Sequence, residues 1–210
     1  MKSTKPLFLS VFALFVWITT PLLNGCASND EQTSNKNSDS YKKYSNQLVT
    51  DRKNKDQFFR TNVDSPLESK DTFTGLSYFV VSPDYRVTAR FEPFADKTQK
   101  LIVALSDGSE EVYEKQGHAV FKLNGEVCRL LIVKHDDTFS ILFKDATSGK
   151  QTYGGGRYID LDPNAFADNQ VTIDFNKAYH PYCVYNHTYA CPLPPAENTL
   201  EVAVEAGEKL

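Results

Sequence analysis

The stretch HAVFKLNGEVCRLLIVK, residues 118–134, decides the fold class of this chain. Asn124-Gly125 lies in its middle, and this dipeptide is the strongest short signal for a two-residue turn between paired strands. The residues on either side are rich in valine, leucine and other apolar side chains, which is typical of buried strands. The stretch therefore predicts an antiparallel β-hairpin.

Further short apolar runs, many with a period of two, lie on both sides of this hairpin, from Phe73 to Gly207. Turn signals separate them at spacings of roughly 8 to 12 residues, as in a β-sandwich or barrel. Strands do not alternate with helical patterns, so a parallel sheet is not expected. We therefore predict a mainly β fold, an antiparallel barrel or sandwich of about nine strands. The segment 174–198, stiffened by prolines, is expected to form a long ordered loop near the C-terminus.

One helix is expected, over Tyr41 to Arg60. Tyr41, Tyr44, Leu48 and Phe59 recur at helical spacing, with lysine and aspartate on the opposite face. This apolar stripe is interpreted as the face by which an N-terminal helix docks on the β domain.

The chain begins with the features of a bacterial lipoprotein signal peptide, predicted for residues 1–25. Two lysines are followed by a charge-free apolar run and then by LNGC, residues 23–26, which resembles the lipobox. Cys26 is therefore the predicted lipid acceptor. A retained transmembrane anchor is the alternative, because the run approaches the ~20 residues that a span needs. Ala27 stands where an aspartate would signal inner-membrane retention, so the outer membrane of the bacterial cell envelope is the expected location.

Residues 26–40 have almost no apolar side chains and are expected to form a disordered tether. Residues 41–210 are long enough for a single β domain. Removal of residues 1–25 takes away two lysines and shifts the formal net charge from −4 to −6. An acidic chain binds nucleic acid poorly. The expected partner is therefore the membrane, which the lipid would contact. The sequence does not indicate the oligomeric state.

Two long runs carry a family resemblance: FKDATSGKQTYGGGRYIDL, residues 143–161, and VTIDFNKAYHPYCVYNHTYACPLPPAENTLEVAVEAGEK, residues 171–209. They resemble DUF1684, a family of bacterial proteins, many secreted or lipid-anchored, with no assigned biochemical function. The resemblance covers roughly residues 41–209 and implies one shared domain. His180 departs from it, because the family pattern has asparagine there, and His187 belongs to none of its motifs.

Histidines and cysteines alternate near the C-terminus, in the order His180, Cys183, His187 and Cys191. Four such ligands would suit tetrahedral zinc, but the family pattern supplies only the cysteines, so no metal site is predicted. In an oxidising compartment Cys183 and Cys191 are expected to form a disulfide. Reduced packing cysteines, or a reactive thiol, are the alternatives.

The run TYGGGRY, residues 152–158, is a second dense cluster. Its glycines permit positive φ and leave backbone N–H groups open to an anion beside Arg157. A sharp bend in the sheet is the favoured interpretation. In either case the guanidinium of Arg157 needs a partner, and Asp174 or Glu208 is the expected one.

A module that binds a small polar or anionic molecule is the favoured function, and enzymatic activity is not assigned. An envelope enzyme of hydrolase type, with Asp174 or Glu208 as general base, is one alternative. A structural role in envelope assembly, with an exposed apolar patch, is the other. The sequence has no cofactor motif and no catalytic signature, so no cofactor is predicted. The candidate ligand-binding residues are Tyr153, Arg157, Asp174, Asn176, Tyr179 and Glu208.

Overall fold

The computed structural model describes residues 29–210, with side chains from residue 38 onward. The predicted signal peptide 1–25, the lipobox and Cys26 lie outside the described residues. Within the described part, no helix is both long and apolar enough to cross a membrane. Residues 39–210 form one compact unit.

Helix α1 spans Asn29–Thr61 and so begins well before the predicted start at Tyr41. It runs through most of the segment 26–40 that was expected to be a tether. The run from Asn29 to Thr61 holds no proline or glycine, so no residue in it breaks the helix. Leu48 and Phe59 are buried, which agrees with the predicted docking stripe.

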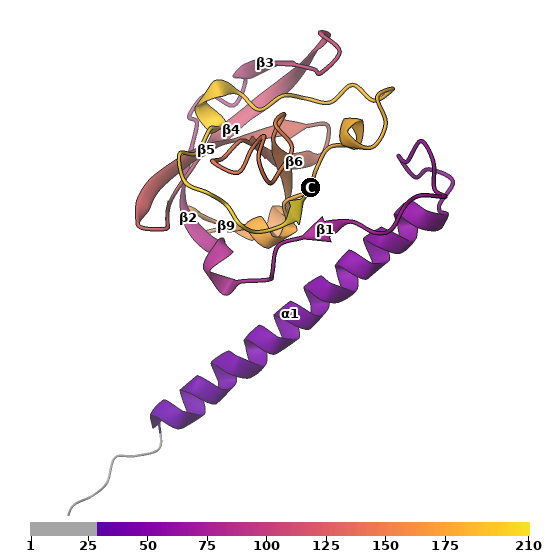
Figure 1. Ribbon diagram of the computed structural model, residues 1–210. Coiled ribbons are helices and arrows are strands. Elements are labelled where there is room, and N and C mark those ends of the chain that lie inside the picture. The colour runs from indigo at the N-terminus through magenta and orange to yellow at the C-terminus, as the bar shows by residue number, and fades with distance from the viewer. Residues whose placement is uncertain (1–28) are drawn as a thin grey trace, which may run out of the picture. The chain divides into compact units, whose positions relative to one another are not determined.

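One eight-stranded antiparallel sheet makes up most of the domain (Figure 1). Its strands follow the order β7-β6-β5-β4-β2-β9-β8, and β3 pairs with β4. A separate two-stranded sheet joins β1 (Ser77–Tyr78) to β10 (Glu208–Lys209). The strands of the large sheet are β2 (Arg86–Pro93), β3 (Lys100–Ala104), β4 (Glu110–Leu123), β5 (Glu126–His135), β6 (Thr138–Phe143), β7 (Arg157–Leu161), β8 (Phe166–Ala167) and β9 (Gln170–Asp174).

The hairpin that decides the fold class is confirmed. Strands β4 and β5 pair from Leu123↔Glu126 onward. Asn124 and Gly125 have φ of 52° and 88°, the two positive values that this kind of turn requires.

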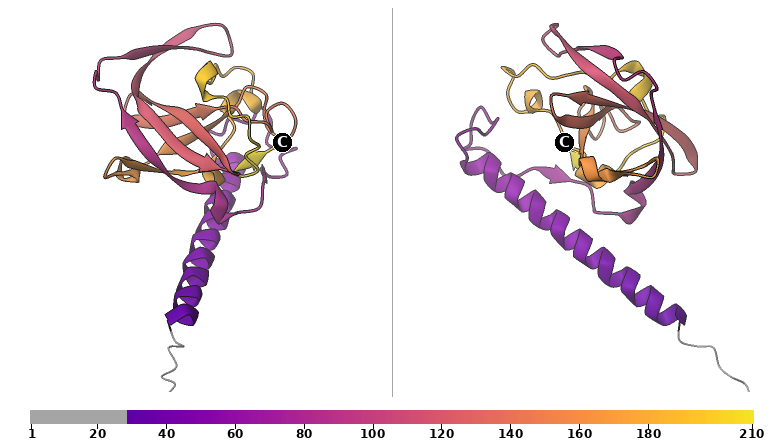
Figure 2. Two further views of the ribbon diagram at one scale, coloured as in Figure 1. Left: turned by 90° about the vertical axis from the view of Figure 1, so that its left-hand side faces the viewer. Right: turned by 180° about the vertical axis from the view of Figure 1, so that it is seen from behind.

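The mainly β, antiparallel class is confirmed, but the barrel alternative is wrong. Within the described residues β7 and β8 end the path of strands, and no pairing joins them to close the sheet. A sandwich-like arrangement fits, because the strongly curved sheet in Figure 2 folds the chain around a core. The run LEVAVEAG, residues 200–207, was expected to be a strand and is instead an extended segment that leads into β10.

Strand β5 is buried on both faces, and residues 130–133 are almost inaccessible to solvent. Leu130 and Ile132 belong to the larger apolar core. Leu131 and Val133 belong to a second cluster on the other face. The C-terminal segment covers this second face, where Asn198 accepts from Leu131 N–H at 2.7 Å and donates to the carbonyl of Leu142 at 2.8 Å.

That segment contains single turns of 3₁₀ helix rather than strands, as the predicted ordered loop requires. They are η3 (Phe175–Lys177), η4 (Tyr182–Val184) and η5 (Ala196–Asn198), while η1 (Pro83–Tyr85) and η2 (Pro163–Ala165) lie earlier in the chain.

Arg157 is completely buried at the start of β7. Its Nη1 donates to the carbonyls of Ala206 and Glu208. Its Nη2 donates to the Val204 carbonyl at 2.8 Å and to Asp145 Oδ2 at 2.9 Å. The guanidinium therefore ties the C-terminal segment to the sheet.

The expected carboxylate partners of Arg157 were wrong. Asp145 takes this place because β6 and β7 pair antiparallel, with Phe143 opposite Arg157, so the residues just after β6 lie beside the guanidinium. Gly156 supports the bend interpretation of the glycine run. Its φ is +100°, and a Cβ there would lie 2.6 Å from the Phe143 carbonyl oxygen.

We predict that Arg157→Met lowers the free energy of unfolding by about 3–5 kcal/mol, because it leaves the buried Asp145 carboxylate unpaired. Urea unfolding followed by circular dichroism measures this loss. Arg90→Met is the matched control, since the Arg90 side chain is exposed in β2 and forms a surface ion pair with Glu92. The control is expected to change stability by less than about 0.5 kcal/mol. Equal stability of the two variants would contradict the structural role of Arg157.

Candidate functional site

The six predicted ligand-binding residues do not form one site. Asn176, Tyr179 and Glu208 line a pocket of about 260 Å³ against helix α1. Asp174 lies on a neighbouring groove of about 300 Å³. Arg157 is enclosed in the core, and Tyr153 lies outside this pocket.

Asp174 and Asn176 hold the helix and the loop together. The Asp174 carboxylate accepts from Tyr44 Oη at 2.7 and 2.8 Å. Asn176 Nδ2 donates to the Ser82 carbonyl at 2.8 Å, and its Oδ1 accepts from Ser82 N–H at 3.0 Å. Burial and the neighbouring Asp174 raise the pKa of Tyr44, so this phenol stays a donor at neutral pH. Both predicted residues therefore have structural partners.

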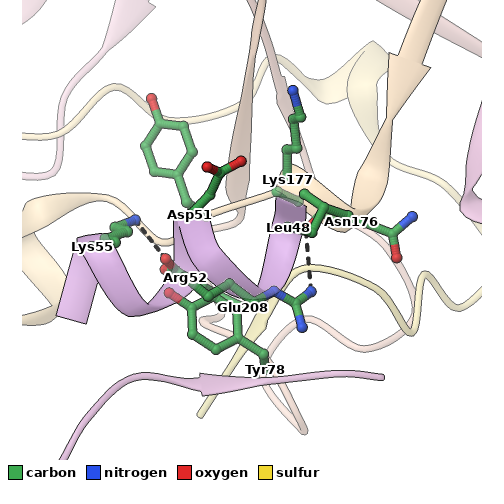
Figure 3. Close-up of a pocket in the computed structure, with 10 residues that line it drawn as sticks. Leu48, Asp51, Arg52, Lys55, Tyr78, Asn176, Lys177 and Glu208 are labelled. Carbon is green, nitrogen blue, oxygen red and sulfur yellow. Dashed lines mark hydrogen bonds and ion pairs between the residues drawn. The ribbon is translucent and has the colours of Figure 1, made fainter. Parts of the chain in front are cut away.

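The Arg52 pocket, as we call it, lies between α1, β1 and the chain around β10. Figure 3 shows the guanidinium of Arg52 beside the ring of Tyr78, with Lys55 and Glu208 pointing toward each other. Arg52 Cζ lies 4.4 Å from the centre of the Tyr78 ring. The pocket is lined by Leu48, Asp51, Arg52, Lys55, Tyr78, Asn176, Lys177, Ala178, Tyr179 and Glu208.

Arg52 is held by backbone carbonyls rather than by a carboxylate. Its Nη1 donates to the Phe79 carbonyl at 2.9 Å and its Nη2 to the Asn176 carbonyl at 3.3 Å. Among the described side chains, no carboxylate lies within salt-bridge distance of it. Burial lowers the pKa of Arg52, so an anion nearby would favour its charged form.

Two buried polar atoms beside this pocket lack a hydrogen-bond partner in the described part of the chain. They are Arg52 Nε and Tyr78 Oη. A buried polar atom without a partner costs roughly 1–3 kcal/mol. A third such atom in the described residues is Nε of the core residue Arg157. Such atoms are uncommon in native structures, and each one needs an explanation.

Glu208 is buried and fully engaged. Its carboxylate accepts from Lys55 Nζ at 2.5 Å, from His180 N–H at 2.7 Å and from Tyr185 Oη at 3.2 Å. Burial, with the nearby charge of Glu208, raises the pKa of Tyr185. Both oxygens of the carboxylate therefore accept hydrogen bonds, and these bonds order the pocket wall.

A second cavity, of about 470 Å³, adjoins the Arg52 pocket, with which it shares Lys55 and Tyr179. We call it the tyrosine cleft. It is lined by Lys55, Tyr158, Asp160, Tyr179, Pro181, Tyr182, Tyr189, Ala190 and Cys191.

The two cysteines of the predicted disulfide are free thiols in the structure. They lie close together, because Cys183 N–H donates to Cys191 Sγ at 3.1 Å. Burial and the neighbouring Cys183 raise the pKa of Cys191 to about 12. That thiol is protonated at neutral pH, which does not suit a nucleophile. Tyr153 also lies beside Cys183. Burial is the main cause that raises the pKa of the Tyr153 phenol, and Cys183 adds to it.

The histidines are far from a zinc arrangement. In the described residues no group of three or more potential metal ligands comes together. His187 is in an exposed turn, where its N–H donates to Glu68 at 3.2 Å. His180 is buried, and its Nε2 accepts from Tyr153 N–H at 3.3 Å. Burial, with Arg157 and Lys55 nearby, lowers the pKa of His180 to about 4.

Sequence reasoning missed Arg52, Lys55 and Tyr78 as site residues. Arg52 and Lys55 are three positions apart, so they project from one face of α1. The signal in the sequence that could have identified them is this pair of cationic side chains beside the predicted docking stripe. Tyr78 carries no comparable signal, because its place depends on the pairing of β1 with β10.

We predict that His180 makes stability depend on pH. Its pKa is 6.5 in the unfolded chain and about 4 in the folded protein, so its contribution is present above pH 6.5 and lost as pH falls toward 4. The loss amounts to about 3 kcal/mol. Urea unfolding of the parent and of His180→Asn across this pH range measures it. The variant should show a shallower decline, and equal slopes for the two proteins would refute the assignment.

Comparison with known proteins shows which family this chain belongs to. A solution NMR structure of an uncharacterized protein from Haloarcula marismortui is 38% identical, with a TM-score of 0.64. The match covers 82% of this chain and 97% of that one. None of the curated proteins matches the chain. The family model DUF1684, described as a protein of unknown function, matches residues 71–209. The chain therefore belongs to the DUF1684 family.

Proposed function

We propose that this protein binds a small anionic molecule in the Arg52 pocket, without catalysis, as a lipid-anchored protein of the bacterial cell envelope. The observation that carries the proposal is Arg52 itself, a half-buried cation without a carboxylate partner among the described residues. Arg52 Nε and the nearby Tyr78 Oη also have no partner there. An anion beside Arg52 would supply the counter-charge that this guanidinium lacks among the described residues.

The charges around the pocket support an anion as the ligand. Arg52, Lys55 and Lys177 line it against the carboxylates of Asp51 and Glu208. Lys55 and Glu208 neutralise each other in an ion pair. Lys177 is exposed and makes no ion pair within the described part of the chain. Arg52 and Lys177 therefore outweigh Asp51, and the pocket favours a small, singly charged group.

The enzyme alternative has less support. A general base needs a carboxylate that is free to take a proton. Asp174 accepts from Tyr44, and Glu208 accepts from three donors that include Lys55. Both carboxylates are therefore committed to hydrogen bonds that hold the helix and the loop in place.

The structural-assembly alternative rests on an exposed apolar patch. Ile102 and Val112 are exposed cross-strand partners on β3 and β4. Two side chains of this size form a small patch, and single exposed apolar residues are ordinary on protein surfaces. The Arg52 pocket has more specific features, so ligand binding is the preferred function.

We predict that inorganic phosphate, used as a simple anion, binds the full folded domain in isothermal titration calorimetry. Arg52→Gln should weaken binding at least about tenfold, because it removes a charge-assisted contact of roughly 1.5–3 kcal/mol. Lys177→Gln should weaken it by a smaller factor, since Lys177 is exposed. Higher ionic strength should weaken binding in all of them.

Lys53→Gln is the matched control, because Lys53 is exposed on the same helix and lies outside the pocket. It makes the same change of charge as the test variants and should leave the affinity unchanged. Circular dichroism establishes that each variant is folded. Equal weakening by Lys53→Gln and Lys177→Gln would show a nonspecific charge effect and would contradict the proposed pocket.

The lipid anchor and the disulfide are tested by intact mass. In protein purified from its own host, we predict cleavage before Cys26 and acyl groups on that residue, because LNGC resembles a lipobox. After incubation with a small-molecule disulfide as oxidant, the mass of the protein should fall by two hydrogen atoms, because Cys183 and Cys191 form a disulfide.

Cys26→Ala should abolish the acyl mass and leave the thiol oxidation unchanged. Cys183→Ser should do the reverse. An unacylated Cys26 in host protein would overturn the anchor, and two thiols that stay reduced under oxidant would overturn the disulfide.

A further inference from the structure

The tyrosine cleft lies next to the Arg52 pocket, and the two cavities share Lys55 and Tyr179 as a common wall. The two cavities are therefore neighbours on the surface of the domain. The cleft, at about 470 Å³, is the larger of the two, and the pocket has about 260 Å³. This arrangement offers room for a molecule with two chemically different ends.

Two of the tyrosines that line the cleft have their hydroxyls engaged in hydrogen bonds. Tyr158 Oη donates to the Pro192 carbonyl, and Tyr179 Oη donates to Asp160 Oδ2 at 2.9 Å. Burial raises the pKa of both phenols, so they stay neutral donors. With their hydroxyls engaged, these side chains present their rings to the cleft.

Two further tyrosines form the outer part of the cleft. Tyr182 and Tyr189 pack edge to face, with ring centres 5.4 Å apart. Each is 38% exposed, which is high for an aromatic side chain. Aromatic rings prefer edge-to-face or offset stacked partners, so a flat ring of a ligand would fit against them.

Lys55 and Asp160 are the charged side chains that line the cleft. Lys55 Nζ lies 4.8 Å from the centre of the Tyr179 ring, so a cation already occupies one aromatic face. Asp160 is the carboxylate of the cleft, and it accepts from Tyr179 and from Ser140 Oγ at 2.9 Å. With Lys55 on one aromatic face and the Asp160 carboxylate already hydrogen-bonded, the remaining aromatic surface of the cleft suits an uncharged ring.

We propose that the ligand is an aryl anion, whose acidic group binds in the Arg52 pocket and whose aromatic ring lies in the tyrosine cleft. This assignment rests on the proposed anion-binding function and adds the ligand class. The bond that joins the ring of the ligand to its acidic group would pass beside Lys55 and Tyr179, which line both cavities.

Three probes separate the two parts of the proposal: inorganic phosphate, 1-naphthyl phosphate and the uncharged 1-naphthol. Calorimetric titration of the full domain should give an affinity for 1-naphthyl phosphate at least about tenfold above that for phosphate. Tyr189→Ala should remove most of this difference and leave phosphate binding unchanged. Arg52→Gln should weaken both phosphates.

Tyr41→Ala is the matched control, because Tyr41 is 37% exposed and lies outside both cavities. It should leave the affinity for 1-naphthyl phosphate unchanged. If the two phosphates bind equally, the aryl class is overturned and anion binding stands. If 1-naphthol binds as tightly as 1-naphthyl phosphate and Arg52→Gln affects neither, anion binding fails. If no probe binds, both proposals fail.

Discussion

The buried guanidinium of Arg157 is the interaction on which the rest of the structure depends. It donates to Asp145, just after β6, and to three carbonyls of the extended segment that ends the chain. A charge in the core is stable only when it is paired and well hydrogen-bonded. This segment must therefore lie where its carbonyls meet the two Nη atoms of the guanidinium. That placement sets β10, which pairs with β1 and brings Glu208 opposite Tyr78.

The Arg52 pocket is a consequence of this closure. Glu208 and Tyr78 reach the pocket through the two-stranded sheet, and α1 supplies Arg52 and Lys55 from the other side. Most buried polar groups here are paired, as Asp174 and Asn176 illustrate. Among the described residues three buried polar atoms have no partner, and two of them, on Arg52 and Tyr78, belong to side chains that line the pocket. Functional positions are where a fold tolerates such exceptions.

Local patterns predicted the elements well and their partners poorly. The Asn124-Gly125 turn and the stripe of α1 depend on neighbouring residues, so they could be read directly. The partner of Arg157 depends on which strands pair, and the pairing of β6 with β7 makes it Asp145 rather than Asp174 or Glu208. The open sheet, in place of a possible barrel, depends on whether β7 and β8 meet, which no local pattern encodes. A disulfide between Cys183 and Cys191 was predicted. The structure brings the two residues close together, but both are free thiols in it.

The sequence by itself determined the antiparallel β class, the docking helix and the membership of residues 71–209 in a family, because these depend on periodicity, turn chemistry and long motifs. Only the tertiary structure decided that Arg157 is an internal clamp, and that Arg52, from a helix, meets Tyr78 and Glu208 from two short strands. Arg52 is 26 positions from Tyr78 and 156 positions from Glu208 in the sequence, yet all three side chains line one pocket. Their geometry follows from the packing of whole elements, which no short stretch of sequence specifies.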